Sequence, residues 1–153
     1  MAYKRILVPV DGSPTSNRGM MEAFRLARAT RARVRLLHVV EEYAAFSAPE
    51  VAVDIGPLLD AMRRSGRRKL EAIERRARRT GAKPETALAE NFGSRVSDTI
   101  VAQAKRWRAD LIVMGTHGRR GVKRALLGSD AELVVRYSPV PVLLIPAAGR
   151  GRR

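Results

Sequence analysis

The segment from Gly115 to Ser129 has the composition of a loop that binds an anion. It reads Gly-Thr-His-Gly-Arg-Arg-Gly-Val-Lys-Arg-Ala-Leu-Leu-Gly-Ser and follows an apolar run at 111–114. Glycines let a backbone approach a ligand closely, and the N–H groups at a helix start lack intrahelical acceptors and carry partial positive charge. Several basic side chains add full charges, namely Arg119, Arg120, Lys123 and Arg124. The segment therefore predicts a phosphate-binding loop.

The glycine spacing excludes two familiar phosphate motifs. No glycine is followed by Lys-Ser or Lys-Thr, as a P-loop requires, and the dinucleotide fingerprint is absent. A glycine-rich turn can also serve a purely steric purpose, which is the structural alternative. The place of the loop, after a predicted strand and before a predicted helix, favours the functional interpretation.

Hydrophobic patterning predicts strands that alternate with helices. Apolar runs predict strands at 6–10, 34–40, 86–89, 111–114 and 141–145. Helical spacing predicts helices at 16–30, 95–107 and 129–137, and a long basic helix that contains 59–79 and ends before Gly81. In the helix at 129–137, Ala131, Val134 and Val135 are expected to face inward. Residues 41–57 lack a clean period and are expected to form a loop with at most a fragment of helix. The pattern predicts a parallel sheet with helices on both faces.

Ligands of such sheets bind beyond the carboxyl ends of the strands, where the strand order reverses. If the first and fourth strands are central neighbours, Asp11-Gly12 and Met114-Gly115 border one crevice. Asp11 is therefore a candidate ligand residue, although it could instead cap its own turn. His117 lies inside the loop and could donate to phosphate or act as an acid or base, but no carboxylate partner is evident by spacing. His38 is expected to be a strand-end residue.

Length and composition narrow the class of protein. The 153 residues suit one domain over 1–147, with a basic tail at 148–153. Cysteine is absent, which excludes disulfides and thiolate metal sites, and no apolar stretch approaches the roughly 20 residues of a membrane span. We expect a cytoplasmic protein. The net charge of +15 favours anionic partners, unless it reflects a compositional bias. Because no aromatic residue lies between Arg63 and Arg79, we expect no specific nucleic-acid binding, and nonspecific polyanion binding stays open.

The glycines of the loop also form a recognisable pattern. Gly115, Gly118, Gly128 and Ser129 follow the order Gly, two residues, Gly, nine residues, Gly, Ser. This order resembles the nucleotide-binding motif of the universal stress protein family. The resemblance extends over nearly the whole chain, through Ile6 to Ser13, Leu37-His38-Val39, Gly93, Asp110 to Gly118, and Pro139 to Ile145.

The resemblance implies a doubly wound α/β fold with strand order 3-2-1-4-5 that binds ATP, ADP or AMP. It implies that adenine lies near Asp11 and Val39, ribose near Asp11 and Gly115, and the phosphates along Gly118, Arg119, Gly128 and Ser129. A magnesium ion bound to the nucleotide can lie near Asp11, and homodimers form through the last strand, here 142–145. The residues expected at the nucleotide are Pro9, Val10, Asp11, Val39, Met114, Gly115, Gly118, Arg119, Gly128, Ser129 and Asp130.

Asp130 departs from the pattern of the family, where a small or apolar residue often follows the serine. Its carboxylate suits the positive end of a helix dipole but competes with phosphate for the same N–H groups. Three functions follow from these observations. The first is a stress-response regulator controlled by nucleotide and dimerisation. The alternatives are a slow ATPase, for which no base to orient water is evident, and a scaffold that binds polyanions or a protein through its arginine-rich surface.

Overall fold

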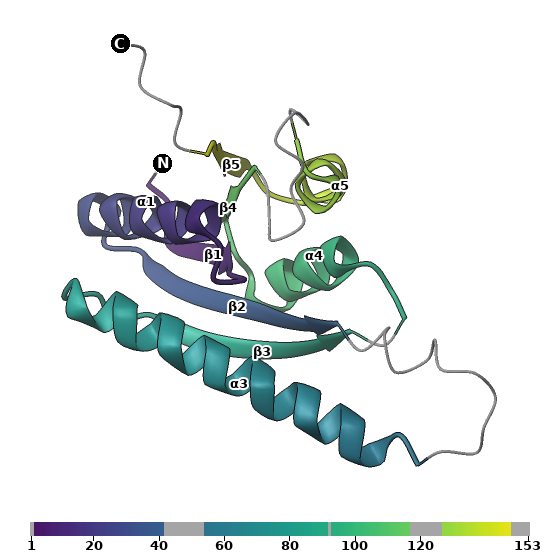
Figure 1. Cartoon of the computed structure of the whole chain (residues 1–153). Coiled ribbons are helices and arrows are strands. Elements are labelled where there is room, and N and C mark those ends of the chain that lie inside the picture. Colours follow the sequence, from purple (N-terminus) through teal and green to yellow (C-terminus); the bar gives the residue numbers. More distant parts are fainter. Residues whose placement is uncertain (1, 42–53, 92, 117–126, 148–153) are drawn as a thin grey trace, which may run out of the picture.

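A five-stranded parallel sheet forms the centre of the molecule (Figure 1). The computed structural model describes residues 2–41, 54–91, 93–116 and 127–147. Every paired strand is parallel, and the order across the sheet is β3-β2-β1-β4-β5. The predicted fold class and strand order are therefore confirmed. The strands are β1 (Arg5–Pro9), β2 (Arg33–Glu41), β3 (Glu85–Asn91), β4 (Leu111–Gly115) and β5 (Val142–Ile145).

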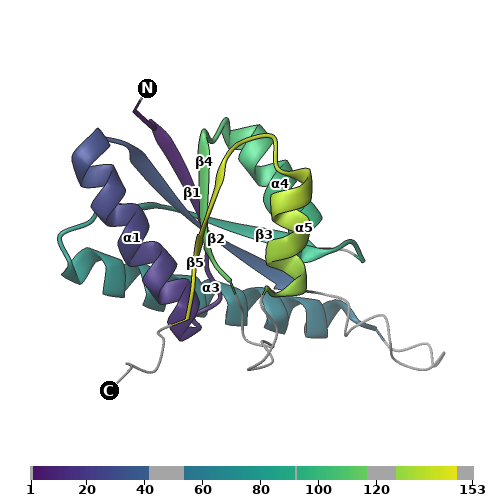
Figure 2. The same cartoon turned by 90° about the horizontal axis from the view of Figure 1, so that it is seen from above.

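Helices cover both faces of this sheet. They are α1 (Pro14–Thr30), α3 (Gly56–Arg79), α4 (Val96–Trp107) and α5 (Ser129–Tyr137). Buried side chains of α1 and α3 share one apolar cluster with the sheet, and those of α4 and α5 share a second cluster on the other face. Figure 2 shows α1 on one side of the sheet and α4 with α5 on the other. None of the described helices is both long and apolar enough to cross a membrane.

The central strand β1 is buried on both faces, which explains the continuous apolar run in its sequence. Ile6 and Val8 point into the cluster beneath α1 and α3, whereas Leu7 points into the cluster beneath α4 and α5. All three side chains are fully buried. A parallel strand with both faces covered needs apolar residues at every position, so alternation is absent from its sequence.

Some details of the sequence prediction are wrong. Val10 lies beyond the end of β1, because the strand closes at Pro9, whose nitrogen has no hydrogen to donate to the ladder. Val135 is 47% exposed rather than turned inward. Only Ala131 and Val134 of α5 are buried, because the short helix lies beside the edge strand β5 and presents a single narrow stripe to the sheet. The loop predicted at 41–57 is also too long, because Glu41 ends β2 and Gly56 and Pro57 begin α3. Residues 42–53 of that loop and the predicted tail at 148–153 lie outside the described residues.

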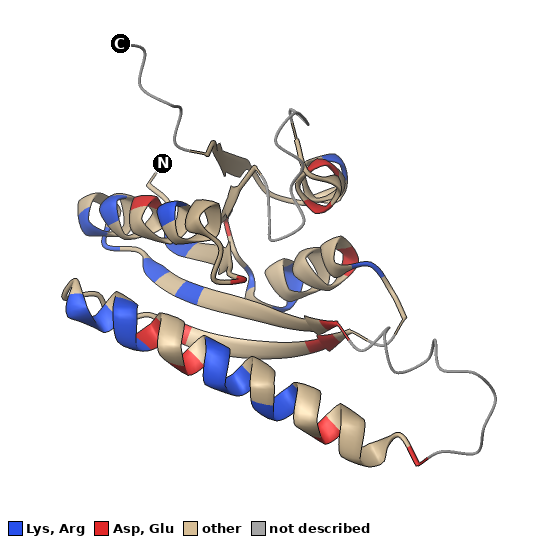
Figure 3. Ribbon diagram, in the orientation of Figure 1, with Lys and Arg blue, Asp and Glu red and all other residues tan. Residues whose placement is uncertain are grey.

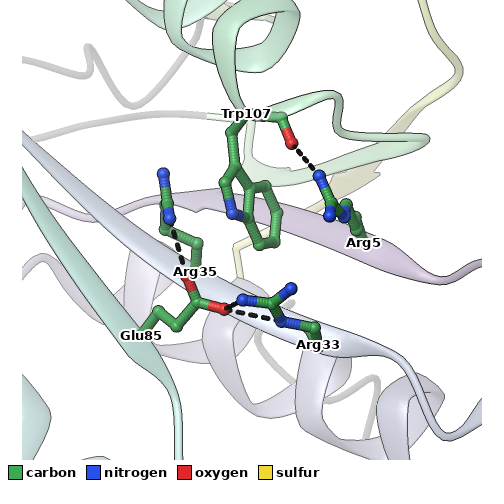
Figure 4. A network of polar contacts seen from close by, with 5 residues as sticks. All are labelled: Arg5, Arg33, Arg35, Glu85 and Trp107. Atoms are coloured by element: carbon green, nitrogen blue, oxygen red, sulfur yellow. Dashed lines mark hydrogen bonds and ion pairs between the residues drawn. The ribbon is translucent and has the colours of Figure 1, made fainter.

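Charged and aromatic side chains join the amino ends of β1 and β2 to the last turn of α4 (Figure 4). The guanidinium of Arg35 stacks on the ring of Trp107, 4.6 Å from its centroid. Arg5 Nη1 donates a 2.8 Å hydrogen bond to the Trp107 carbonyl. Trp107 is 6% exposed, so these contacts surround a buried ring. Cation–π contacts of this kind add stability when the cation is partly desolvated.

Glu85 extends this network to the first residue of β3. Its carboxylate accepts hydrogen bonds from Arg33 Nε at 2.8 Å and from Arg35 Nη2 at 2.6 Å. Burial opposes ionisation of this carboxyl, but the hydrogen bonds from Arg35 and Arg33 outweigh it and hold the pKa of Glu85 below its usual value. Three adjacent strands are therefore joined by side chains at the end of the sheet where they begin.

Candidate functional site

The carboxyl ends of β1 and β4 meet at the point where the chain reverses its winding direction. β1 pairs with β2 on one side and with β4 on the other, with Ile6 opposite Leu111 and Leu7 opposite Ile112. In open parallel sheets, ligands bind beyond the carboxyl ends of strands at such a switch point. The predicted juxtaposition of the segments after β1 and β4 is therefore present.

The turn after β1 is held by side chains at its own corner and in α1. The N–H of Ser13 donates to Asp11 Oδ1 at 2.9 Å, and the N–H of Asp11 donates to Ser16 Oγ at 3.2 Å. Gly12 adopts a φ of +82°, which glycine tolerates without strain. Ser13 then caps α1 by accepting from the N–H of Ser16 at 3.2 Å. Asp11 thus has the capping role that the sequence offered as the alternative to ligand binding, and its place at the switch point suits both roles.

The segment after β4 begins and ends at neighbouring positions. The N–H of Thr116 donates to the Ile145 carbonyl at 3.0 Å, and the N–H of Gly128 donates to the Thr116 carbonyl at 2.7 Å. Gly128 is also the N-cap residue of α5. Its N–H group therefore already has an acceptor. The first turn of α5 is formed by the next three residues, 129–131, and the N–H groups of a helix's first turn point out of its N-terminal end.

Two glycines allow α1 to pack closely against the end of β4. A Cβ atom on Gly115 would lie 2.6 Å from Thr15 Cγ2 and 3.0 Å from the Thr15 carbonyl carbon. On the other side of the contact, a Cβ on Gly19 would lie 3.5 Å from the Gly115 nitrogen. Gly115 therefore has a steric reason to be glycine, in addition to the ligand role that the sequence pattern implies. The contact fixes the start of α1 beside β4.

The remaining predicted residues fall into two groups. Pro9 ends β1, Met114 is buried at the end of β4, and Val39 on β2 packs against the cluster beneath α4 and α5. Gly118 and Arg119 lie outside the described residues, as does His117.

Asp130 occupies the first turn of α5, where a carboxylate favours the helix dipole. Among the described residues, no three His, Cys, Asp or Glu side chains gather to hold a metal ion.

His38 is a feature of the site that the sequence alone did not reveal. The sequence suggested only a residue near the end of a strand. Its side chain is 7% exposed, and its Nδ1 atom lies 2.7 Å from the carbonyl oxygen of Val10. The residues are 28 positions apart, so no local pattern could have joined them. The imidazole thus contacts the residue immediately before Asp11.

Comparisons with known proteins identify the family of this chain. The sequence profile of the Universal stress protein family matches residues 2–146. A universal stress protein of Methanocaldococcus jannaschii is 33% identical over 144 residues, which cover 94% of this chain and 82% of the relative. Among solved structures, a universal stress protein in complex with cAMP is 28% identical, with a TM-score of 0.66 and coverage of 95% and 98% of the two chains.

A second solved structure is the universal stress protein from Archaeoglobus fulgidus in complex with dAMP. It is 25% identical to this chain, with a TM-score of 0.64, and the match covers 95% of this chain and 99% of that one. The family profile spans β1 to β5, which includes the turn after β1 and the start of α5. The chain belongs to the universal stress protein family.

Proposed function

We propose that this chain binds an adenine nucleotide at the carboxyl ends of β1 and β4. The observation that carries the proposal is the convergence of three backbone elements. The turn at Asp11, the end of β4 at Gly115 and the first turn of α5 are brought together by the strand pairing and by the bond between Gly128 and Thr116. Solved relatives in complex with cAMP and dAMP support adenosine monophosphates as the ligand class.

Each end of the proposed nucleotide has a suitable neighbour. Adenine lies against Val39 and Asp11, where an apolar side chain and a hydrogen-bond acceptor are available. The phosphate lies toward Gly118, Arg119 and the first-turn N–H groups of α5, where the helix start favours an anion. Asp130 shares that first turn. Its negative charge repels additional phosphates, so we expect a monophosphate to bind more tightly than a triphosphate in the absence of metal.

The binding of ATP and of magnesium stays a prediction. We expect the ion to arrive on the phosphates and to lie near Asp11, since no three metal-binding side chains gather among the described residues. Magnesium would offset the repulsion between Asp130 and a triphosphate. We therefore expect ATP binding to depend on magnesium more strongly than AMP binding does. Hydrolysis and a cytoplasmic location likewise stay predictions.

We further propose that ligand state is read through a homodimer. β5 lies at one edge of the sheet, and only β4 pairs with it among the described strands. Val135 and Tyr137 of the neighbouring helix α5 are 47% and 56% exposed, so apolar surface continues beside that edge. A second copy pairing its own β5 would cover the edge and this surface. Sedimentation of the parent and of Val135→Glu tests the proposal, because the variant is expected to lower the mass without unfolding the chain.

The direct test of nucleotide binding compares the chain with Gly128→Val. The φ and ψ of Gly128, −71° and 151°, suit any residue, so valine adds bulk at the site without backbone strain. Thr86→Val is the control, because it introduces a valine at an exposed position of β3. Titration calorimetry with AMP, cAMP and ATP, with and without magnesium, is expected to show binding to the parent and the control only. An absence of heat with every nucleotide in the parent would refute the proposal.

Binding to polyanions is a second candidate function, favoured by the surface of α3. In Figure 3, Lys and Arg positions, coloured blue, recur along the ribbon of this helix. Its exposed arginines include Arg64, Arg67, Arg68, Arg75 and Arg76. Binding to immobilised heparin is expected to weaken steeply as salt rises, because counterion release drives it. The candidate requires that neutralising Arg67, Arg68, Arg75 and Arg76 abolishes retention while Gly118→Val leaves it unchanged.

A further inference from the structure

The peptide group between Val10 and Asp11 is bonded on both sides. Its carbonyl oxygen lies 2.7 Å from Nδ1 of His38 on β2, and its N–H donates to Ser16 Oγ on α1 at 3.2 Å. The N–H of Val10 itself donates to the Leu37 carbonyl at 2.8 Å, so Val10 follows β2 although β1 has ended. The plane of this peptide is therefore fixed from two different elements. The Asp11 side chain leaves the backbone directly beside it.

The chemistry of the short contact determines which atom carries the proton. A carbonyl oxygen can only accept, so Nδ1 of His38 must donate. Val10 is 4% exposed and His38 is 7% exposed, so water cannot readily replace the imidazole. A buried carbonyl that loses its donor keeps the cost of its lost hydration. The bond between His38 and Val10 is therefore a strong restraint on the end of β1.

Packing from α3 keeps the imidazole in this position. Gly66 is the residue of α3 that lies over His38 and Val40, and a Cβ atom there would come within 3.5 Å of His38 Cδ2 and 2.5 Å of Val40 Cγ2. The helix backbone thus approaches β2 as closely as glycine permits. The ring lies between the sheet and α3, with little space to rotate away from Val10.

We propose that His38 is a positioning residue for the nucleotide site, which holds the Val10 carbonyl so that Asp11 faces the ligand. The inference rests on the proposed nucleotide-binding function and assigns His38 no contact with the ligand. It also makes α3 a support of the site, because Gly66 lets the helix hold the imidazole against β1. Disturbing His38 is expected to weaken nucleotide binding even when the fold survives.

A matched pair of substitutions separates the hydrogen bond from the bulk of the ring. His38→Asn places an amide N–H close to the position of Nδ1, whereas His38→Leu keeps a similar volume and removes the donor. In calorimetry with AMP, the Leu variant is expected to raise Kd roughly twofold to tenfold, the equivalent of one hydrogen bond. The Asn variant is expected to stay within about twofold of the parent, because it restores the bond. Equal Kd values for the two variants would overturn the proposal.

A second measurement does not depend on nucleotide. Hydrogen exchange of the Asp11 amide reports whether the peptide remains ordered, since that N–H is bonded to Ser16 Oγ. Exchange is expected to accelerate in His38→Leu and to stay near the parental rate in His38→Asn. If His38→Leu fails to fold, His38→Gln replaces it, because its amide aligns with Nε2 rather than Nδ1. Identical exchange in the donor and non-donor variants would overturn the inference.

The two measurements distinguish failure of the inference from failure of the proposed function. If the parent binds no nucleotide, the proposed function is refuted, and the exchange rates still decide whether His38 orders the turn at Asp11. If the parent binds and His38→Leu binds equally well with unchanged exchange, nucleotide binding stands and the positioning role of His38 is refuted.

Discussion

The contact between α1 and the end of β4 yields the sharpest stability prediction. Gly115→Ala adds a Cβ atom 2.6 Å from Thr15 Cγ2, 3.0 Å from the Thr15 carbonyl carbon and 3.1 Å from Thr15 Cβ. Two of these neighbours belong to the backbone or are attached directly to it, so a rotamer change cannot relieve the overlap. Thr15 is 8% exposed and lies in the first turn of α1. The helix start must therefore move away from β4.

Overpacking of this kind typically costs about 1–3 kcal/mol. We expect Gly115→Ala to lower the free energy of unfolding by an amount in that range. Gly19→Ala is the matched control on the opposite side of the same contact, since its Cβ would lie at an ordinary 3.5 Å from the Gly115 nitrogen. Alanine also favours an α-helix interior over glycine by up to about 1 kcal/mol. The control is therefore expected to be neutral or stabilising.

The stability of both variants is measured by urea unfolding. The protein concentration is kept fixed, because dimerisation would make the apparent stability depend on it. Thr15→Ser removes the methyl group that lies 2.6 Å away and leaves the contacts at 3.0 and 3.1 Å. In a double-mutant cycle it is expected to recover at least about 0.5 kcal/mol of the loss in Gly115→Ala. Parental stability of Gly115→Ala, or an equal loss in Gly19→Ala, would refute the steric reasoning.

Three further predictions concern α3, α4 and the network at Glu85. Gly66→Ala is expected to cost about 1–3 kcal/mol in urea unfolding because its Cβ would lie 2.5 Å from Val40 Cγ2, whereas the exposed neighbour Ser65→Ala should be neutral or better. Ser97→Ala is expected to match or exceed parental stability, since the buried Ser97 hydroxyl has no hydrogen-bond partner among the described residues, and a loss above about 1 kcal/mol would contradict this. The pKa of Glu85 is lowered in the folded state. The stability that its ionised carboxylate contributes is therefore complete above the unfolded pKa near 4.5 and is lost as pH falls through the folded pKa. Thermal unfolding of Glu85→Gln should therefore show a weaker loss of stability on acidification than the parent shows, and parallel pH profiles would argue against the linkage.

The sequence predicted the sheet because its signals are local. Continuous apolar runs flanked by turn residues mark strands buried on both faces, and all five predicted strands are present within a residue or two of their expected bounds. The end of β1 was misplaced by one residue because Val10 is apolar and buried for a different reason. It packs in the core while its backbone bonds to Leu37 and His38.

The site was predicted only in outline. The pattern at Gly115, Gly128 and Ser129 indicated a loop between a strand and a helix. It did not indicate that the N–H of Gly128 donates to the Thr116 carbonyl. The steric demand of Thr15 on Gly115 could not be predicted either, since it depends on how closely α1 approaches β4. Such contacts join residues that are distant in sequence, and periodicity carries no information about them.

The polar network drawn in Figure 4 lies at the amino ends of the strands, whereas the ligand is proposed at their carboxyl ends. It joins the starts of three strands at the end of the sheet away from the connections that follow β1, β2 and β4. We therefore expect that exchanging those connections would leave the contacts at the strand starts in place. A graft of these loops from another member of the family should inherit the register of the host scaffold and bring the donor's ligand preference with it.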